Sequence, residues 1–185
     1  MAYAKLTETN ADNSIANDNW QRDRTWKQLT DKANKAYSAS QIPLAEALYR
    51  DALEKAEMLF EDESNSDNSI PLPVIYNISC HNLAELCEHQ GMTDEAARFY
   101  KQAYDRLLST ANEPCAALQL RLSCMQHLKH TLSVLIHFLQ RNGASNEHMG
   151  KLIQQAHHTA YRVYQIVQHS AHFDQCQKER PALLS

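Results

Sequence analysis

Histidine and cysteine are the residues of this 185-residue chain with the clearest potential for chemistry. All ten histidines lie after residue 80, and several lie three or four residues from a cysteine or from another histidine, which is helical spacing. Imidazole and thiolate are common protein ligands of zinc and copper. A metal-binding or metal-dependent protein is therefore one interpretation. Its ligands would be Cys124, His127 and His130, or His169, His172 and Cys176.

The spacing within the first of these groups does not favour a metal site. Cys124 and His130 are six residues apart, so their side chains diverge by about 240° around a helix. The sequence contains no HExxH motif and no CxxC pair. We therefore expect the histidines to be polar residues of a surface or groove. We predict no bound metal and no cofactor.

Motifs of the common enzyme classes are absent from the sequence. With only three glycines, the chain cannot form a glycine-rich loop around a phosphate. No nucleophile elbow or triad-like motif is present either. We predict that the protein is not an enzyme.

Composition excludes several other classes of function. The net charge is −4 and no block of Lys or Arg exists, which argues against nucleic-acid binding. No apolar run reaches the length of about 18 residues needed to cross a bilayer, and the N-terminus does not resemble a secretory signal. The five cysteines lie mostly in apolar helical patterns. Free thiols and a cytoplasmic location are therefore expected.

Long helices are expected because glycine and proline, which punctuate turns, are both scarce. We predict a flexible N-terminal tail over residues 1–19, a helical domain over residues 20–172 and a C-terminal tail over residues 173–185. Six helices are expected, beginning near Trp20, Pro43, Pro71, Thr93, Asn112 and Ser145. The fifth is predicted to bury Leu118, Leu122, Met125, Leu132, Leu135, Ile136 and Leu139, and the sixth Ile153, Ala156, Ala160, Val163 and Val167.

The predicted helices fall into three pairs with a regular period. A tight turn is expected in the middle of each pair, at Ser40, Gly91 and Gly143, and these turns are 51 and 52 residues apart. The second pair has small residues at Ala84, Ala96 and Ala103 and an aromatic at Tyr100. The first pair repeats this pattern with Ala33, Ala36, Ala45, Tyr49 and Ala52.

With these residues the chain resembles the tetratricopeptide repeat (TPR) family over residues 26–168. The period departs from the family's usual value of about 34 residues, so the helices here are longer. The third pair keeps only Gly143 and Ala156 of the pattern. The resemblance implies an all-α fold, in which three antiparallel helical hairpins stack as a short right-handed superhelix.

The resemblance also implies a function. In the TPR family the first helix of each hairpin lines a concave surface that receives a peptide or helix of a partner protein. We therefore expect a scaffold or adaptor module, with a secretion-type chaperone or a regulatory protein as alternatives within the binding class. The expected partner-binding residues are Asn34, Tyr37, His81, Asn82, Glu85, His89, His130 and His137.

Two further expectations concern partners. Asn34 and Asn82 match the two Asn positions of the clamp with which some TPR proteins hold a C-terminal carboxylate, but the basic positions of that clamp are Thr30, His130 and Val134 here. The sixth helix carries apolar or aromatic residues on more than one face, which is compatible with a homodimer through the C-terminal helices. Those residues are Ile153, Tyr161, Val163, Tyr164, Ile166 and Val167.

Overall fold

The computed structural model describes residues 22–61 and 70–178, and within these ranges the chain forms helices and no strand. The predicted all-α class is confirmed. The predicted tail over residues 1–19 and the helix start at Trp20 lie outside the described residues. The helices are α1 (Arg22–Ser38), α2 (Ile42–Glu61), α3 (Leu72–His89), α4 (Thr93–Asn112), α5 (Leu118–Arg141) and α6 (Asn146–Lys178).

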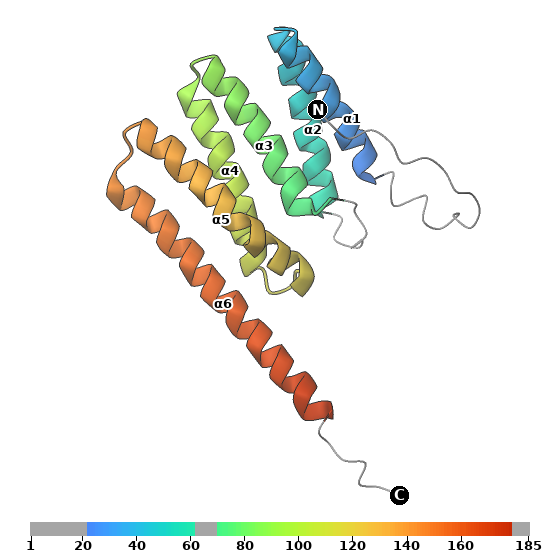
Figure 1. The fold of residues 1–185 in the computed structure, drawn as a ribbon, viewed down its shortest axis with the longest axis vertical. Helices are drawn as coiled ribbons and strands as arrows, with labels where there is room; N and C mark the ends of the chain where they lie inside the picture. Colours follow the sequence, from blue (N-terminus) through green and yellow to red (C-terminus); the bar gives the residue numbers. More distant parts are fainter. Residues whose placement is uncertain (1–21, 62–69, 179–185) are drawn as a thin grey trace, which may run out of the picture.

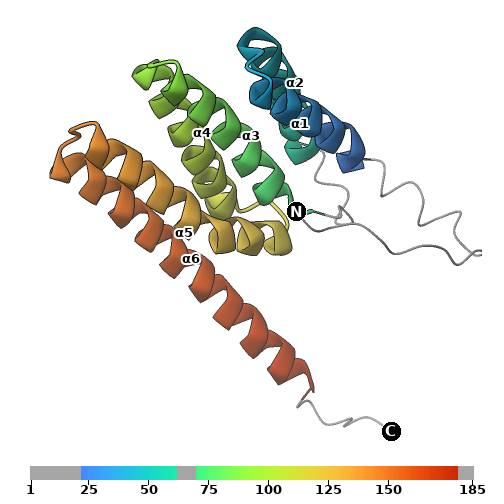
Figure 2. The same cartoon turned by 45° about the horizontal axis from the view of Figure 1, so that its top comes forward.

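Each helix packs against the next one in the sequence, and the chain reverses direction at every connection (Figure 1). Two further contacts join the hairpins: α3 packs against α5, and α4 against α6. In both views α6 runs beyond the end of α5 (Figure 2). It continues to Lys178, six residues past the boundary expected at His172. None of the helices, over the described ranges, is long and apolar enough to cross a membrane.

The three hairpin turns have the same backbone geometry. Ser40, Gly91 and Gly143 adopt positive φ angles of 58°, 73° and 74°. In each turn the following residue donates its N–H to a carbonyl five residues earlier, as from Met92 to Cys87 (2.9 Å). This pattern is the Schellman motif, which satisfies the last carbonyls of a helix. The predicted turn positions are therefore correct, and Ser40 takes the conformation that glycine takes in the other two turns.

Replacing Gly91 with alanine is expected to destabilise the protein by about 1 kcal/mol, because a side chain disfavours the left-handed conformation. An added Cβ would meet no atom within 4 Å, so the backbone angle alone sets the cost. Gly150→Ala is the matched control, because Gly150 lies inside α6 with equally free space and no positive φ. Alanine there should stabilise by about 0.5–1 kcal/mol. Urea unfolding of both variants tests the sign, and destabilisation by both would contradict this account.

The small and aromatic residues of the repeat pattern form the core of the first two hairpins. Ala33, Ala45, Ala84 and Ala96 have no exposed surface, and the tyrosines at the aromatic positions are almost fully buried. Small residues let two helices approach closely, and the neighbouring aromatic ring fills the space beside them. The pattern that carried the TPR resemblance thus lies where helices pack.

The predicted start of the fifth helix is wrong, and its predicted buried face is only partly correct. Asn112 ends α4 and does not begin the next helix, because Pro114 favours an extended residue before it, and Glu113 has ψ 112°. The expected helix start at Thr93 is correct, although no side chain caps α4. Ser145 caps α6, because its hydroxyl accepts a hydrogen bond from the His148 N–H (3.2 Å). The buried face of α5 consists of Arg121, Cys124, Leu128, Thr131, Leu135 and Phe138, so of the predicted set Leu135 is fully buried. Leu122, Met125, Leu132, Ile136 and Leu139 are half-buried against the core.

The predicted inner face of α6 is partly correct. Ala156 and Val163 are buried, whereas Ile153 and Ala160 are exposed. Tyr161 and Tyr164 are also exposed, at 62% and 57%. Self-association through this helix stays a prediction.

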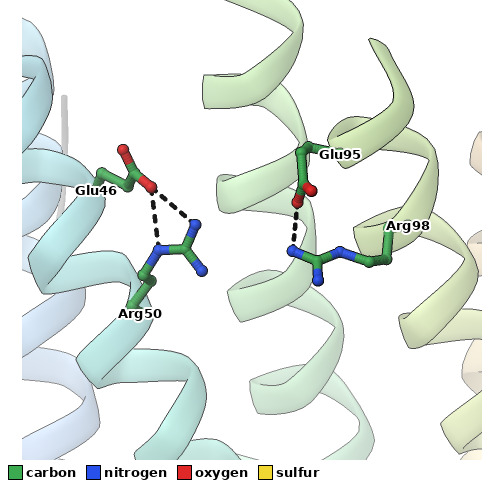
Figure 3. A network of polar contacts seen from close by, with 4 residues as sticks. All are labelled: Glu46, Arg50, Glu95 and Arg98. Atoms are coloured by element: carbon green, nitrogen blue, oxygen red, sulfur yellow. Dashed lines mark hydrogen bonds and ion pairs between the residues drawn. The ribbon is translucent and has the colours of Figure 1, made fainter. Parts of the chain in front are cut away.

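Two arginine–glutamate pairs, one within α2 and one within α4, lie where the first hairpin faces the second (Figure 3). Arg50 binds Glu46 (2.8 Å), and Arg98 binds Glu95 within α4. Both arginines lie over the ring of Phe99, with Cζ 5.8 Å and 5.1 Å from its centroid. Exposed ion pairs contribute little stability, so their main effect is to orient the two arginines over the ring.

Candidate functional site

Side chains of α1, α3 and α5 meet directly, so the first helices of the three hairpins are neighbours. Trp26 on α1 donates from Nε1 to Ser79 Oγ on α3 (2.8 Å). Thr131 on α5 donates to Asn77 Oδ1 on α3 (2.8 Å). The sequence-predicted binding residues therefore belong to adjacent helices, which is the condition for them to form one surface.

A surface pocket of about 430 Å³ opens between α3, α4 and α5. Three of the predicted binding residues line it, namely Glu85, His89 and His137. A fourth, Tyr37, stacks on His89 with ring centroids 5.6 Å apart, so α1 contributes to the same region. We call this the inter-hairpin pocket. Its lining residues are Glu85, Glu88, His89, Tyr100, Val134, His137, Phe138 and Arg141.

Glu88 connects the three helices around the inter-hairpin pocket. Its Oε1 accepts a hydrogen bond from the Tyr100 hydroxyl (2.7 Å), and its Oε2 binds Arg141 Nη2 (2.7 Å). Burial raises the pKa of Tyr100, and the hydrogen bond to Glu88 raises it further. The hydroxyl therefore stays protonated and keeps donating. This network fixes Arg141 and neutralises its charge with that of Glu88.

Glu85 differs from Glu88 in having no such partner. Its side chain is exposed, and in the part of the chain that the structure describes it makes no ion pair or hydrogen bond. Its negative charge adds to the effect of burial in raising the pKa of Tyr49 on α2 and of Tyr100 on α4. The Glu85 carboxylate therefore interacts electrostatically with tyrosines of the first and second hairpins. It has no bonded partner among the described residues and is available to a ligand.

His81 and His130 form a separate pair outside the lining of the inter-hairpin pocket, with His81 half-buried and His130 exposed. Their ring centroids are 6.3 Å apart, and His81 packs edge-on against Tyr100 at 5.3 Å. His81 Nε2 is buried without a hydrogen-bond partner within the described ranges. Burial, and secondarily the charge of His130, lower the pKa of His81 to about 4. His81 is therefore neutral near pH 7 and is mainly a packing residue.

The two asparagines do not line the inter-hairpin pocket. Asn34 Oδ1 accepts a hydrogen bond from the Tyr49 hydroxyl (2.7 Å), so one of its polar atoms already has a partner. Asn34 also lines a second surface pocket with Asp31, Lys35, Ser38 and Ala39 on α1. Asn82 is half-buried on α3. The structure brings Glu85, His89, His137 and Tyr37 together but leaves the asparagines outside this group.

Sequence reasoning placed Tyr100 in the core and did not select Glu88 as a binding residue. Tyr49 and Tyr100 occupy the same repeat position, and each donates its hydroxyl to a polar residue of the preceding helix, Asn34 or Glu88. The repeat gives only a partial signal, because the two tyrosines are equivalent but their acceptors lie 15 and 12 residues earlier in the chain.

The metal interpretation gains no support from the described residues. No group of three or more His, Cys, Asp or Glu side chains is placed to hold an ion there. Cys124 is fully buried whereas His130 is exposed, so the two point to different surroundings. The side chains of His169, His172 and Cys176 lie outside those that the structure describes.

Comparison with known proteins gives one match. The model of a family described as protein of unknown function (DUF2753) matches residues 24–173. No curated protein and no solved structure matched the chain. The matched range includes every residue that lines the inter-hairpin pocket.

Proposed function

The chain belongs to the DUF2753 family of proteins of unknown function, and we propose from its side chains that it is a protein–protein interaction module. The partner would be a peptide or a helical segment. It would bind the surface of α1, α3 and α5, and the protein would act as a scaffold or adaptor. The hairpins would stack as a short right-handed superhelix of the TPR type, which makes such a surface concave.

The observation that carries this proposal is the convergence of exposed polar side chains from two hairpins on one pocket. Glu85 and His89 come from α3, His137 and Arg141 come from α5, and all four are exposed. Sites for small molecules are enclosed mostly by apolar residues. This pocket is lined mainly by charged and polar groups, which favours a segment of another protein.

The local geometry of the hairpins supports the same proposal. Helix-ending turns recur at 51 and 52 residues with the same hydrogen bonds, and small residues lie at the crossings of the first two hairpins. Repeats of one supersecondary unit typically build an extended binding surface from equivalent positions. Tyr49 and Tyr100, at equivalent repeat positions, each donate a hydrogen bond to a side chain of the preceding helix. The same kind of contact therefore positions side chains on the first helix of both hairpins.

We place the protein in a reducing compartment, which suits a cytoplasmic module. Cys80 and Cys87 are free and buried, and Cys115 is free and exposed. Burial raises the pKa of the Cys80 and Cys87 thiols. These two cysteines therefore stay as unreactive thiols in the core.

Affinity capture tests the proposed surface. The tagged protein would be used to retain partners from a lysate of its own cells, beside the variant His89→Ala/His137→Ala. The control is His157→Ala/His158→Ala, because these histidines are exposed on α6. We expect a partner that the wild type and the control retain and the first variant loses. Equal retention by all three proteins would reject the surface.

A further inference from the structure

We infer that the inter-hairpin pocket receives a lysine or arginine side chain of the partner segment, and that Glu85 holds its charge. This inference rests on the proposed function and adds the chemistry of the partner. Its evidence is the balance of charge in the pocket, the chemistry of the pocket wall and the absence of a competing partner for Glu85.

The charge of the pocket is negative when its histidines are neutral. Three of its lining residues carry formal charge: Glu85, Glu88 and Arg141. Arg141 and Glu88 are bound to each other at 2.7 Å, so these two charges offset each other. The charge of Glu85 remains without compensation. A cation from a partner would complete the arrangement.

The wall of the pocket suits a long cationic side chain. Lysine and arginine keep their charge in polar surroundings while their methylene groups pack on apolar surface. Half-buried Val134 and buried Phe138 provide such apolar surface on α5. The Tyr37–His89 stack adds aromatic rings beside Glu85 and Glu88, and aromatic faces attract cations.

An acidic side chain fits the same pocket less well. Arg141 would be its strongest partner, but Arg141 already binds Glu88. A second carboxylate would also lie near Glu85, where like charges repel. The whole chain has a net charge of −4, so long-range attraction favours a basic partner as well.

Selection from a phage-displayed library of random dodecapeptides tests the inference. The targets are the wild type, Glu85→Lys and Glu54→Lys. Glu54 is exposed on α2 and lies outside the inter-hairpin pocket, so this control has the same change of net charge. We expect the wild type and the control to enrich peptides with Lys or Arg at one common position. Glu85→Lys should lose these peptides and enrich Asp or Glu there.

Affinity measurements then connect the basic residue to Glu85. With the best wild-type peptide, Glu85→Gln should weaken binding about three- to tenfold, as should alanine in place of the peptide's basic residue. The two changes together should cost little more than either one, because both remove the same contact. Fully additive losses would reject the contact.

The outcomes separate this inference from the proposed function. Peptides enriched without a common basic position, or enrichment that Glu85→Lys leaves unchanged, would overturn the inference and leave the interaction module in place. Peptides that bind wild type but not His89→Ala/His137→Ala would still support the surface in that case. If wild type enriches no peptide over the empty support, both proposals fail.

Discussion

Replacing Phe138 with alanine is expected to lower the free energy of unfolding by about 3–5 kcal/mol. Phe138 is 2% exposed on α5, and its ring centroid lies 5.0 Å from that of Tyr100 on α4. It therefore packs between the second and third hairpins beneath the inter-hairpin pocket. Removing the ring loses buried apolar area and leaves a cavity that the surrounding helices cannot fully close. Urea unfolding at pH 7 measures the loss.

Gln140→Ala is the matched control for this substitution, because Gln140 is exposed two residues further along the same helix. Its effect should stay within about 0.5 kcal/mol. Phe138→Leu should cost less than Phe138→Ala because it keeps most of the side-chain volume. A loss below about 1 kcal/mol for Phe138→Ala would mean that α5 does not pack on α4 through this face.

Acidification is expected to destabilise the protein through His81, by about 3 kcal/mol in total between pH 6.5 and pH 4. The pKa of a histidine in an unfolded chain is about 6.5, whereas the folded protein lowers the pKa of His81 to about 4 through burial and the charge of His130. Well above pH 6.5 this residue is neutral in both the folded and the unfolded state. As the pH falls from 6.5 to 4, the unfolded state binds the proton before the folded state does. The free energy of unfolding therefore falls.

His81→Leu should remove this component of the pH dependence. At pH 7 its stability should lie within about 1 kcal/mol of wild type, because the volume is similar and the buried Nε2 without a partner disappears. Unfolding curves at several pH values between 7 and 4 give the comparison. His157→Gln, at an exposed position on α6, should keep the wild-type slope. Equal slopes for wild type and His81→Leu would contradict the buried, neutral state of His81.

Turns and small residues could be predicted from the sequence because their physical requirements are local. Gly91 and Gly143 satisfy a positive φ that side chains disfavour, and the spacing of these glycines located Ser40 as well. Ala84 and Ala96 are recognised because a close helix crossing admits only small residues. Each of these features depends on a few neighbours in the chain.

The orientation of α5 could not be predicted in the same way. Leucine, isoleucine, valine, methionine and phenylalanine occur around most of its circumference, so apolar periodicity does not select one face. The buried face includes Arg121 and Thr131, which the sequence would assign to solvent. Each has a distant partner: Arg121 donates to the Ala111 carbonyl (3.0 Å), and Thr131 donates to Asn77. Hydrogen-bonded polar groups can be buried at little cost, and such pairs appear only in the folded chain.

The candidate site shows the same division between local and distant information. Positions on the first helices are given by helical spacing, which correctly grouped Glu85 with His89. The pairing of Glu88 with Arg141 joins residues 53 positions apart, and nothing in either local sequence indicates it. This pairing cancels the charge of the arginine and leaves Glu85 as the uncompensated group, so it decides the chemistry proposed for the partner.

Photocrosslinking tests the central claim most directly. A photoreactive phenylalanine derivative would be placed at position 137, in the inter-hairpin pocket on α5, and separately at position 157 on α6. After illumination in the protein's own cells, mass spectrometry would identify the attached peptides. An interaction module that uses α1, α3 and α5 predicts a discrete adduct with one partner segment from position 137 and not from position 157. An absent adduct at position 137, or the same adducts from both positions, would contradict the proposed binding surface.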